Sequence, residues 1–208
     1  MRKHRLLLSF LQYDWWKIII TALISGLVLG YCFSNSDELK ENEVLEFFVE
    51  GSSNDLSFAS LLYKEIEGDE ILSVHVSAYS PDNSQFALLA SSNASGISDI
   101  FLLSEATLSS DKEYFAYAQE ASSADCALIS ALSYSFYPES IGASKGIKVF
   151  DKNDESYSKN KRISSWFSFS DTTYLFVSSV SSNADSKTKS GSSLLWKSAL
   201  AFLGLALS

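Results

Sequence analysis

The amino-acid sequence predicts an α/β protein: one transmembrane helix followed by a single domain with a mostly parallel βαβαβ core, helices on both faces, and later antiparallel strands. Three observations support this prediction. An apolar run with a single charge occupies residues 15–33. Three strand-like segments then alternate with two segments of helical periodicity. After them, further strand-like segments follow one another without a long helical segment between them.

Residues 15–33 are expected to cross a membrane. The run reads WWKIIITALISGLVLGYCF, and Lys17, its one charge, lies near the inner edge, where its long side chain can reach the headgroups. About 20 apolar residues are enough to span the hydrocarbon layer. Residues 1–17 hold four Lys or Arg and one Asp, and acidic residues follow the run, so the positive-inside rule places the N-terminus in the cytoplasm.

The chain is therefore expected to be a single-pass protein of the cell membrane with its C-terminal domain outside the cell. Its four segments would be a cytoplasmic basic tail (1–14), a transmembrane anchor (15–33), a stalk (34–43) and an extracellular α/β domain (44–208). A cleaved signal peptide is the alternative, but it needs small residues before the cut, where Tyr31, Cys32 and Phe33 stand. A lipoprotein signal is disfavoured because Tyr31 precedes Cys32.

The predicted outer domain is acidic and has one cysteine of its own. The chain has 16 Lys and Arg and 25 Asp and Glu, and removing residues 1–17 leaves 12 basic and 24 acidic residues. Nucleic acids select clustered Lys and Arg, so no nucleic-acid partner is expected. Cys126 is the only cysteine after Cys32, so the domain must be held together by its core rather than by an internal disulfide.

The first half of the domain reads as β-α-β-α-β. Strands are expected at 44–49, 71–79 and 100–103, the first and last nearly apolar throughout, as is typical of strands covered on both faces. The first helix would be capped by Asn54 or Asp55 and stop at Gly68; the second would open at Pro81 and Asp82 and end before Gly96. The apolar residues that define the two helices are Phe58, Leu61, Leu62 and Ile66, then Phe86, Leu89 and Ala90. Right-handed crossovers then give a parallel sheet.

The second half mixes helices and strands. Asp111 would cap a third helix, residues 124–132 a fourth that Pro138 closes, and a last helix would run over 193–207. Only 11 residues follow Lys197, so this last helix is expected to pack on the core rather than to cross a membrane. The remaining segments, in order, are a strand at 146–150, a charged loop at 151–161, and strands at 163–169 and 173–180 around Asp171.

Several segments resemble the extracellular solute-binding proteins of ABC importers, which have the type II periplasmic-binding-protein fold. GISDIFLLSEATL, residues 96–108, is similar to a family segment in which Gly-x-x-Asp leads an apolar strand and an acidic residue opens the next helix. GIKVFDKND (146–154) and TYLFVSSVSSNADSK (173–187) resemble the family's closing pattern. The matching positions of the first segment are Gly96, Asp99, Ile100, Phe101 and Glu105.

This resemblance implies a membrane-tethered extracytoplasmic binding module, non-catalytic and similar to one lobe of a solute-binding protein. The family has two lobes and a lipid-anchored Cys, whereas this chain has length for one lobe and a helical anchor, and so looks like the short, helix-anchored relatives of low-GC Gram-positive bacteria. A small-molecule ligand or a protein partner is then expected at the cell surface. The alternative is a structural or accessory subunit that assembles with other membrane or cell-surface proteins.

No catalytic, metal or cofactor site is expected. The outer domain has one histidine, His75, which lies on a strand between serines and lacks the Ser or Cys arrangement of a nucleophilic enzyme. Asp151, Asn153 and Glu155 resemble the start of a calcium loop, but Ser156 and Arg162 replace its turn glycine and closing Glu. Trp166, Trp196 and Cys126 lie in apolar patterns and are assigned to the core, although either Trp could stack on a sugar.

Overall fold

The computed structural model describes residues 15–34, 39–66, 71–137, 144–154, 162–188 and 191–207. The chain divides into two compact units, Met1–Glu38 and Leu39–Ser208. In the first unit, α2 (Trp15–Ser34) is a single helix of 20 residues. A search of the described residues finds no helix with the length and hydropathy of a membrane span.

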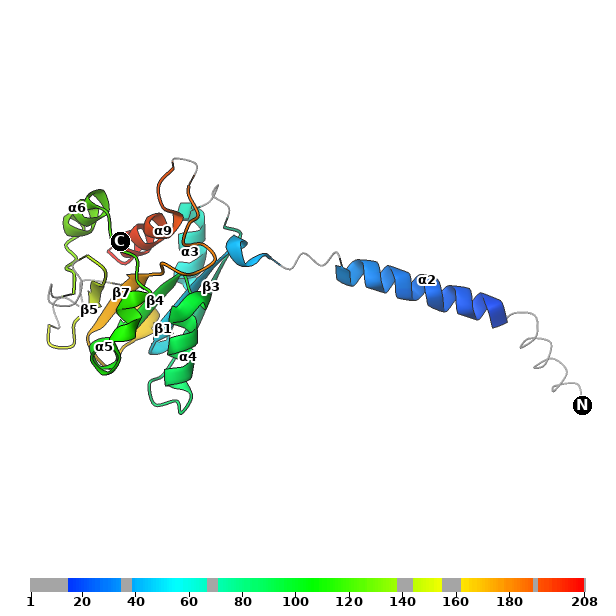
Figure 1. The fold of residues 1–208 in the computed structure, drawn as a ribbon, viewed down its shortest axis with the longest axis horizontal. Helices are drawn as coiled ribbons and strands as arrows, with labels where there is room; N and C mark the ends of the chain where they lie inside the picture. The colour runs from blue at the N-terminus through cyan, green and yellow to red at the C-terminus, as the bar shows by residue number, and fades with distance from the viewer. Residues whose placement is uncertain are drawn as a thin grey trace, which may run out of the picture. The chain divides into compact units, whose positions relative to one another are not determined.

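The second unit contains a mixed five-stranded sheet in the order β3-β1-β4-β7-β5 (Figure 1). β1 (Val44–Glu50) pairs in parallel with both β3 (Ser73–Tyr79) and β4 (Ile100–Ser104). β7 (Thr173–Val177) pairs antiparallel with β4 and with β5 (Ile147–Phe150). The α/β class, the parallel βαβαβ core and the antiparallel later strands are thus confirmed. A small antiparallel ribbon joins β2 (Ser52–Ser53) to β6 (Phe167–Ser168).

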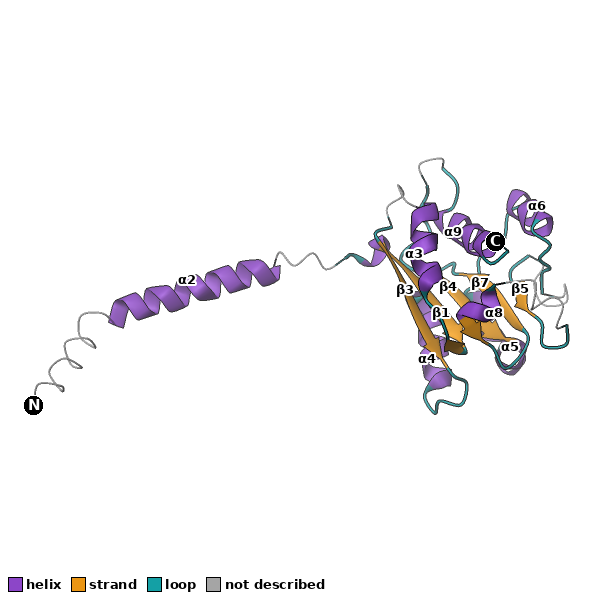
Figure 2. Ribbon diagram, turned by 180° about the vertical axis from the view of Figure 1, so that it is seen from behind, coloured by secondary structure: helices purple, strands orange, loops and turns teal. Residues whose placement is uncertain are grey.

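Apolar side chains alternate between the two faces of the sheet, and each face has its own core. On β1, Phe47 and Val49 belong to one cluster, and Phe48 between them belongs to the other. The first cluster is covered by α3 (Ser57–Ile66), α6 (Ser123–Ala131), α8 (Ile163–Trp166) and α9 (Leu194–Leu205). The second is covered by α4 (Phe86–Ser92), α5 (Glu105–Ser110) and the 3₁₀ helix η3 (Lys112–Ala116). Helices therefore lie over both faces, as Figure 2 shows.

The first core centres on an aromatic cluster that ties the last helix to the sheet. Phe58 of α3 is fully buried, and its ring lies 5.1 Å from the ring of Trp166 and 5.5 Å from that of Phe202 on α9. Truncating such a core Phe to Ala costs about 3–5 kcal/mol. Ser193 caps α9 by accepting a hydrogen bond from the backbone N–H of Trp196. The prediction that residues 193–207 form a core-packing helix is confirmed.

Four local predictions are corrected by the structure. The second helix begins at Phe86, because 81–85 form turns, and it ends in a π-helical turn, η2 (Asn93–Ile97), that includes Gly96 at φ +156°. Residues 163–169, expected as a strand, form the short helix α8 followed by β6. The helix α5, capped by Ser104, begins at Glu105, where the family resemblance implied a helix start, whereas Asp111 caps only a five-residue 3₁₀ helix.

The remaining boundaries lie close to the predictions where they can be compared. α6 matches the helix expected at 124–132, and Asp55 accepts a hydrogen bond from the N–H of Ser57 at the start of α3. The stalk ends in a 3₁₀ turn, η1 (Glu41–Glu43), that leads directly into β1. Gly68, Pro138 and the loop residues 155–161 lie outside the described part of the chain.

Candidate functional site

Two segments that carried the family resemblance meet at the amino ends of β1 and β4. Asp99 is 1% exposed, and its Oδ2 accepts hydrogen bonds from the backbone N–H of Glu46 at 2.9 Å and from Asn183 Nδ2 at 3.0 Å. Asn183 Nδ2 also donates to the carbonyl of Val44. Burial raises the pKa of the Asp99 carboxyl, and the hydrogen bonds from Glu46 N and Asn183 Nδ2 offset part of that effect. These residues clamp the strands together, and none of them lines either of the two pockets described below.

The carboxyl ends of the parallel strands are the usual ligand position in this kind of sheet, at the point where the strand order reverses. Here that point lies between β1 and β4, and it is occupied by Glu50, which is 5% exposed. Glu50 Oε1 accepts from Ser104 Oγ at 2.6 Å and Thr107 Oγ1 at 3.0 Å, and Oε2 accepts from Ser104 N at 2.7 Å. The carboxylate is therefore fully engaged within the protein.

The β2–β6 ribbon covers the same end of the sheet. Gly51, which follows β1 at φ +148°, lies so close to β6 that a Cβ there would be 2.6 Å from the carbonyl oxygen of Ser168. A pocket of about 280 Å³ remains beside the ribbon, lined by Gly51, Ser52, Ser80, Pro81, Asp82, Ser168, Phe169 and Ser170. Small-molecule sites usually have about 300–1,000 Å³, so this pocket is marginal in size.

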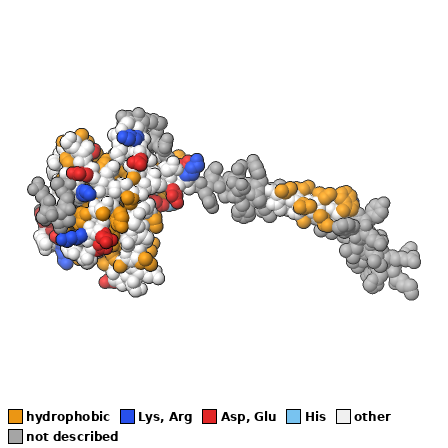
Figure 3. Space-filling model, in the orientation of Figure 1, with side chains coloured by type: hydrophobic (Ala, Val, Ile, Leu, Met, Phe, Trp, Pro, Cys, Tyr) orange, Lys and Arg blue, Asp and Glu red, His pale blue; other side chains and the backbone are white. Residues whose placement is uncertain are grey.

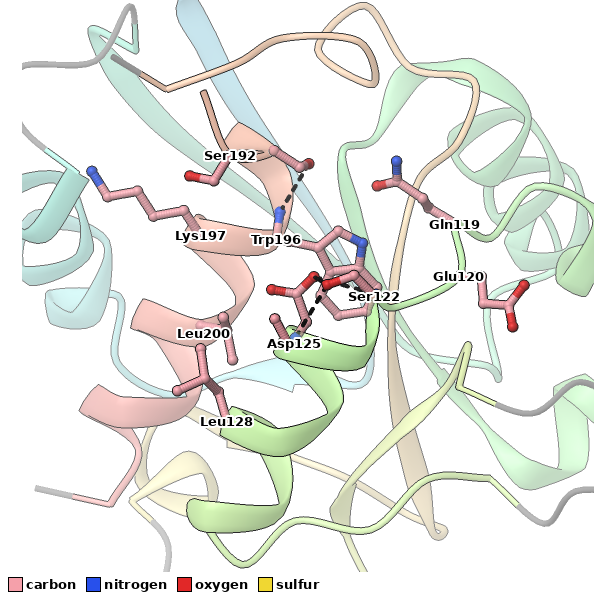
Figure 4. Close-up of a pocket in the computed structure, with 11 residues that line it drawn as sticks. Gln119, Glu120, Ser122, Asp125, Leu128, Ser192, Trp196, Lys197 and Leu200 are labelled. Carbon is pink, nitrogen blue, oxygen red and sulfur yellow. Dashed lines mark hydrogen bonds between the residues drawn. The ribbon is translucent and has the colours of Figure 1, made fainter. Parts of the chain in front are cut away.

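A larger groove lies between α6 and α9. It has a volume of about 520 Å³, within the range of small-molecule sites. We call it the α6–α9 groove; it is lined by Gln119, Glu120, Ser122, Ala124, Asp125, Leu128, Ser192, Ser193, Trp196, Lys197 and Leu200 (Figure 4). The residues come from the segment before α6, from α6 itself and from the start of α9, which are far apart in the sequence.

Two polar atoms in this groove are buried without a hydrogen-bond partner: Trp196 Nε1, a donor, and Gln119 Oε1, an acceptor. Trp196 is 3% exposed. Its nitrogen lies on the side of the ring toward Gln119 in Figure 4. A buried donor or acceptor without a partner costs about 1–3 kcal/mol, so two of them in one groove need a physical reason.

The charged residues of the groove do not supply hydrogen bonds to these two atoms. Asp125 is engaged in the capping box of α6, where its Oδ2 accepts from Ser122 Oγ at 2.6 Å. Figure 4 shows the side chains of Glu120 and Lys197 extending away from the indole ring. Trp196 and Gln119 line the groove with their two unpaired atoms buried, and Leu128 and Leu200 provide apolar walls.

None of the other described residues considered from the sequence lines the α6–α9 groove. The side chain of His75 is 57% exposed, with Nδ1 3.1 Å from Glu46 Oε1. Cys126 is half-buried, with Sγ 3.8 Å from the carbonyl of Ala121. Lys148 and Asp151 form an ion pair at 2.8 Å, and Lys148 lowers the pKa of Asp151. Within the described ranges, no group of three or more His, Cys, Asp or Glu could hold a metal ion.

The sequence correctly predicted that Trp196 is buried, but it did not predict the groove. The sequence placed Trp196 in an apolar helix, and Gln119 belongs to no motif. The available signal was that a buried indole usually needs a partner for its N–H.

Comparison with known proteins yields no relative. No protein-family model matches the chain, and no curated protein and no solved structure matches it either. The resemblance to solute-binding proteins stays a prediction that rests on the segments quoted above.

Proposed function

We propose that this protein is a non-catalytic, membrane-tethered extracytoplasmic binding module that resembles one lobe of a solute-binding protein and binds its ligand in the α6–α9 groove. The main supporting observation is that Trp196 Nε1 and Gln119 Oε1 are buried and unpaired and that both residues line the same groove. A ligand that accepts one hydrogen bond and donates another would satisfy both atoms and remove a cost of about 1–3 kcal/mol for each.

The groove chemistry favours a neutral ligand group. An amide fits best, because its carbonyl would accept from the indole N–H and its N–H would donate to the Gln119 oxygen. Leu128 and Leu200 would pack against an apolar part of the same ligand. The ligand class is therefore a peptide or an N-acetylated sugar rather than a free anion or a metal ion.

The membrane tether is supported by the sequence. Residues 15–33 contain one charge, Lys17, and the basic residues before them and acidic residues after them have the distribution expected for a cytoplasmic N-terminus. Because the groove belongs to the second unit, this orientation would present it outside the cell.

A structural or accessory role is the second candidate, and one surface favours it. Leu88 on α4 is 72% exposed, and Ile97 and Val180 are 58% and 46% exposed. Apolar side chains lie over α4 in Figure 3. Exposed apolar patches commonly mark contacts with other proteins. A partner that copurifies through this surface, lost in Leu88→Lys, would support the accessory role.

Ligand-dependent melting tests the binding proposal. The probes are N-acetylated di- and tripeptide amides and N-acetylglucosamine, added to the purified full chain in detergent. A ligand at 100 times its Kd stabilises the folded state by about 2.7 kcal/mol, which raises Tm by roughly 5–10 °C in a domain of this size. Trp196→Phe keeps most of the ring but deletes the N–H, so it should remove this shift.

Trp166→Phe is the matched control. Trp166 is also 3% exposed, but it packs against Phe58 outside the groove, so its replacement should lower stability and leave the ligand shift intact. The proposal is wrong if none of the probes shifts Tm of the wild-type protein, or if Trp196→Phe retains the full shift.

A further inference from the structure

The two edges of the main sheet differ in whether another segment forms hydrogen bonds to their backbone. At the β5 edge, the segment around Phe136 closes the sheet: Phe136 bridges to Ile147, Lys148 N donates to the carbonyl of Ser135 at 2.7 Å, and Tyr137 N donates to the carbonyl of Gly146 at 2.7 Å. At the opposite edge, β3 pairs with β1 alone among the described residues. β3 is therefore the open edge of the sheet, as Figures 1 and 2 show.

The backbone of β3 has a defined set of groups that face outward. The carbonyl of Tyr79 accepts from Gly51 N at 2.9 Å, so Tyr79 faces β1. Because backbone direction alternates along a strand, His75 and Ser77 also face β1, and the N–H and C=O groups of Val74, Val76 and Ala78 face the open edge. No described residue forms a backbone hydrogen bond to these outward groups.

The sequence of β3 lacks the usual protection of an edge strand. Natural edges are blocked by Lys and other charged residues, by Pro or by bulges. β3 reads SVHVSAY, with seven residues in unbroken register with β1 and no Lys, Arg, Asp, Glu or Pro. Such an edge is a template for another strand.

The same strand is complementary to itself. Residues 73–77 read Ser-Val-His-Val-Ser, which is the same in both directions about His75. Antiparallel strands run in opposite directions, so two copies of this segment paired about His75 place identical residue types at equivalent positions: Ser73 opposite Ser77, Val74 opposite Val76, and His75 opposite His75. A two-fold axis through His75 therefore satisfies the symmetry that a homodimer requires.

We propose that two copies of this chain associate through β3, antiparallel about His75, so that their two main sheets become continuous. The alternation supports this register. Val74 and Val76 face the edge with their backbone groups, so each Val74–Val76 pair exchanges both N–H···O bonds, and the His75 pair on the axis is the close, non-hydrogen-bonded kind, with Cα atoms about 4.5 Å apart.

The side chains are compatible with this pairing. Val74 and Val76 pack partly on the core beneath α3 and would extend that apolar layer across the two-fold axis. The two imidazoles would lie on the other face, each held by its own Glu46, whose Oε1 is 3.1 Å from His75 Nδ1. Each copy thus brings one carboxylate and one imidazole to the axis. An acidic and a basic side chain that face each other across two strands stabilise the pairing.

Cysteine crosslinking tests the register. In full-length protein with Cys32→Ser and Cys126→Ser, the variant His75→Cys should form a disulfide-linked dimer under mild oxidation. Val74→Cys is the matched control: its symmetry mate lies diagonally, about 7–8 Å away, at the limit beyond which two cysteines cannot bridge. A mixture of Val74→Cys and Val76→Cys proteins should crosslink to each other. Equal crosslinking of His75→Cys and Val74→Cys alone would overturn the proposed register.

Size measurement tests the edge itself. The wild-type full chain in detergent should have the mass of two protein chains, measured by light scattering with the detergent subtracted. Val76→Pro removes an outward N–H, which an edge strand tolerates, so it should give a single chain with an unchanged circular dichroism spectrum. Leu88→Lys changes an exposed side chain on α4, not on β3, and should remain dimeric. A monomeric wild type, a dimeric Val76→Pro, or a different protein copurified on the edge would each refute the proposal.

Discussion

Replacing Asp99 tests whether the clamp between β1, β4 and the 178–183 segment is built around a protonated carboxyl. Asp99 Oδ1, Ser181 Oγ and Asn183 Oδ1 are all buried without a hydrogen-bond partner, and Asp99 Oδ2 is engaged by Glu46 N and Asn183 Nδ2. Asp99→Asn keeps the engaged oxygen and puts an NH₂ donor where Oδ1, an acceptor without a partner, was. Asp99→Ala removes both functions.

The two substitutions should therefore have opposite effects. A buried acceptor without a partner costs about 1–3 kcal/mol, so a donor at this position should leave stability unchanged or raise it by about 1 kcal/mol. Asp99→Ala removes the acceptor of two hydrogen bonds and leaves a cavity, which should lower the free energy of unfolding by about 3 kcal/mol. In a domain of this size each kcal/mol shifts Tm by roughly 2–4 °C, so Asp99→Ala should melt roughly 6–12 °C lower.

The effect of Asp99→Asn should grow with pH. Burial raises the pKa of Asp99 above its ordinary value of 3.8, so the folded state keeps the proton to a higher pH than the unfolded chain does. The stabilisation from the protonated Asp99 carboxyl is complete below pH 3.8 and is lost as pH rises through the pKa of the folded state. An Asn side chain does not titrate, so its contribution to stability does not change with pH.

The assay is Tm by circular dichroism for the wild type, Asp99→Asn and Asp99→Ala from about pH 4 to pH 8. The Tm of Asp99→Asn minus that of the wild type should increase through this range. A difference that stays flat or falls with pH, or a loss in Asp99→Asn as large as in Asp99→Ala, would refute the reasoning.

Two further predictions concern a tight turn and a buried phenol. Gly51→Ala should lose about 2 kcal/mol or more, because its Cβ would lie 2.6 Å from Ser168 O, whereas Gly191→Ala, also at positive φ but with nothing within 4 Å, should lose only about 1 kcal/mol of backbone strain. If thermal melts show equal losses of stability in the two variants, the steric argument for Gly51 is wrong. Burial, and next Glu105, raise the pKa of Tyr174 to about 12, so its contribution is present below pH 10 and is lost as pH rises toward 12. Tyr174→Phe should shift alkaline unfolding to higher pH, and an unchanged midpoint would contradict this.

The strands could be predicted because their patterns depend on burial along one element. β1 and β4 carry apolar residues on both faces of the sheet, and helices cover both of these faces. Residues 163–169 were misread because ISSWFSF contains apolar residues at strand-like spacing, while Ile163 and Trp166, three residues apart, are both buried on the one-turn helix α8. α5, at six residues, is too short to show a helical period, so its start at Glu105 was implied only by the family resemblance.

The groove could not be predicted from sequence, because it depends on how α6 and α9 pack in three dimensions. Trp196 reads as a core residue, and it is one, yet it also lines the groove that the packing of these helices creates. Gln119 lies between β-bridge residue Ala118 and the N-terminal cap of α6, where nothing in its neighbours marks a site.

The positions of the polar residues also explain why the groove, rather than the end of the sheet, is the stronger site. Glu50 at the carboxyl ends of β1 and β4 uses both oxygens on Ser104 and Thr107, and the β2–β6 ribbon lies over that end. Asp99 and Asn183 bond to each other and to the backbone at the opposite end. The proposal of ligand binding therefore rests on the α6–α9 groove, whose volume is within the range of small-molecule sites and whose lining includes Trp196 and Gln119.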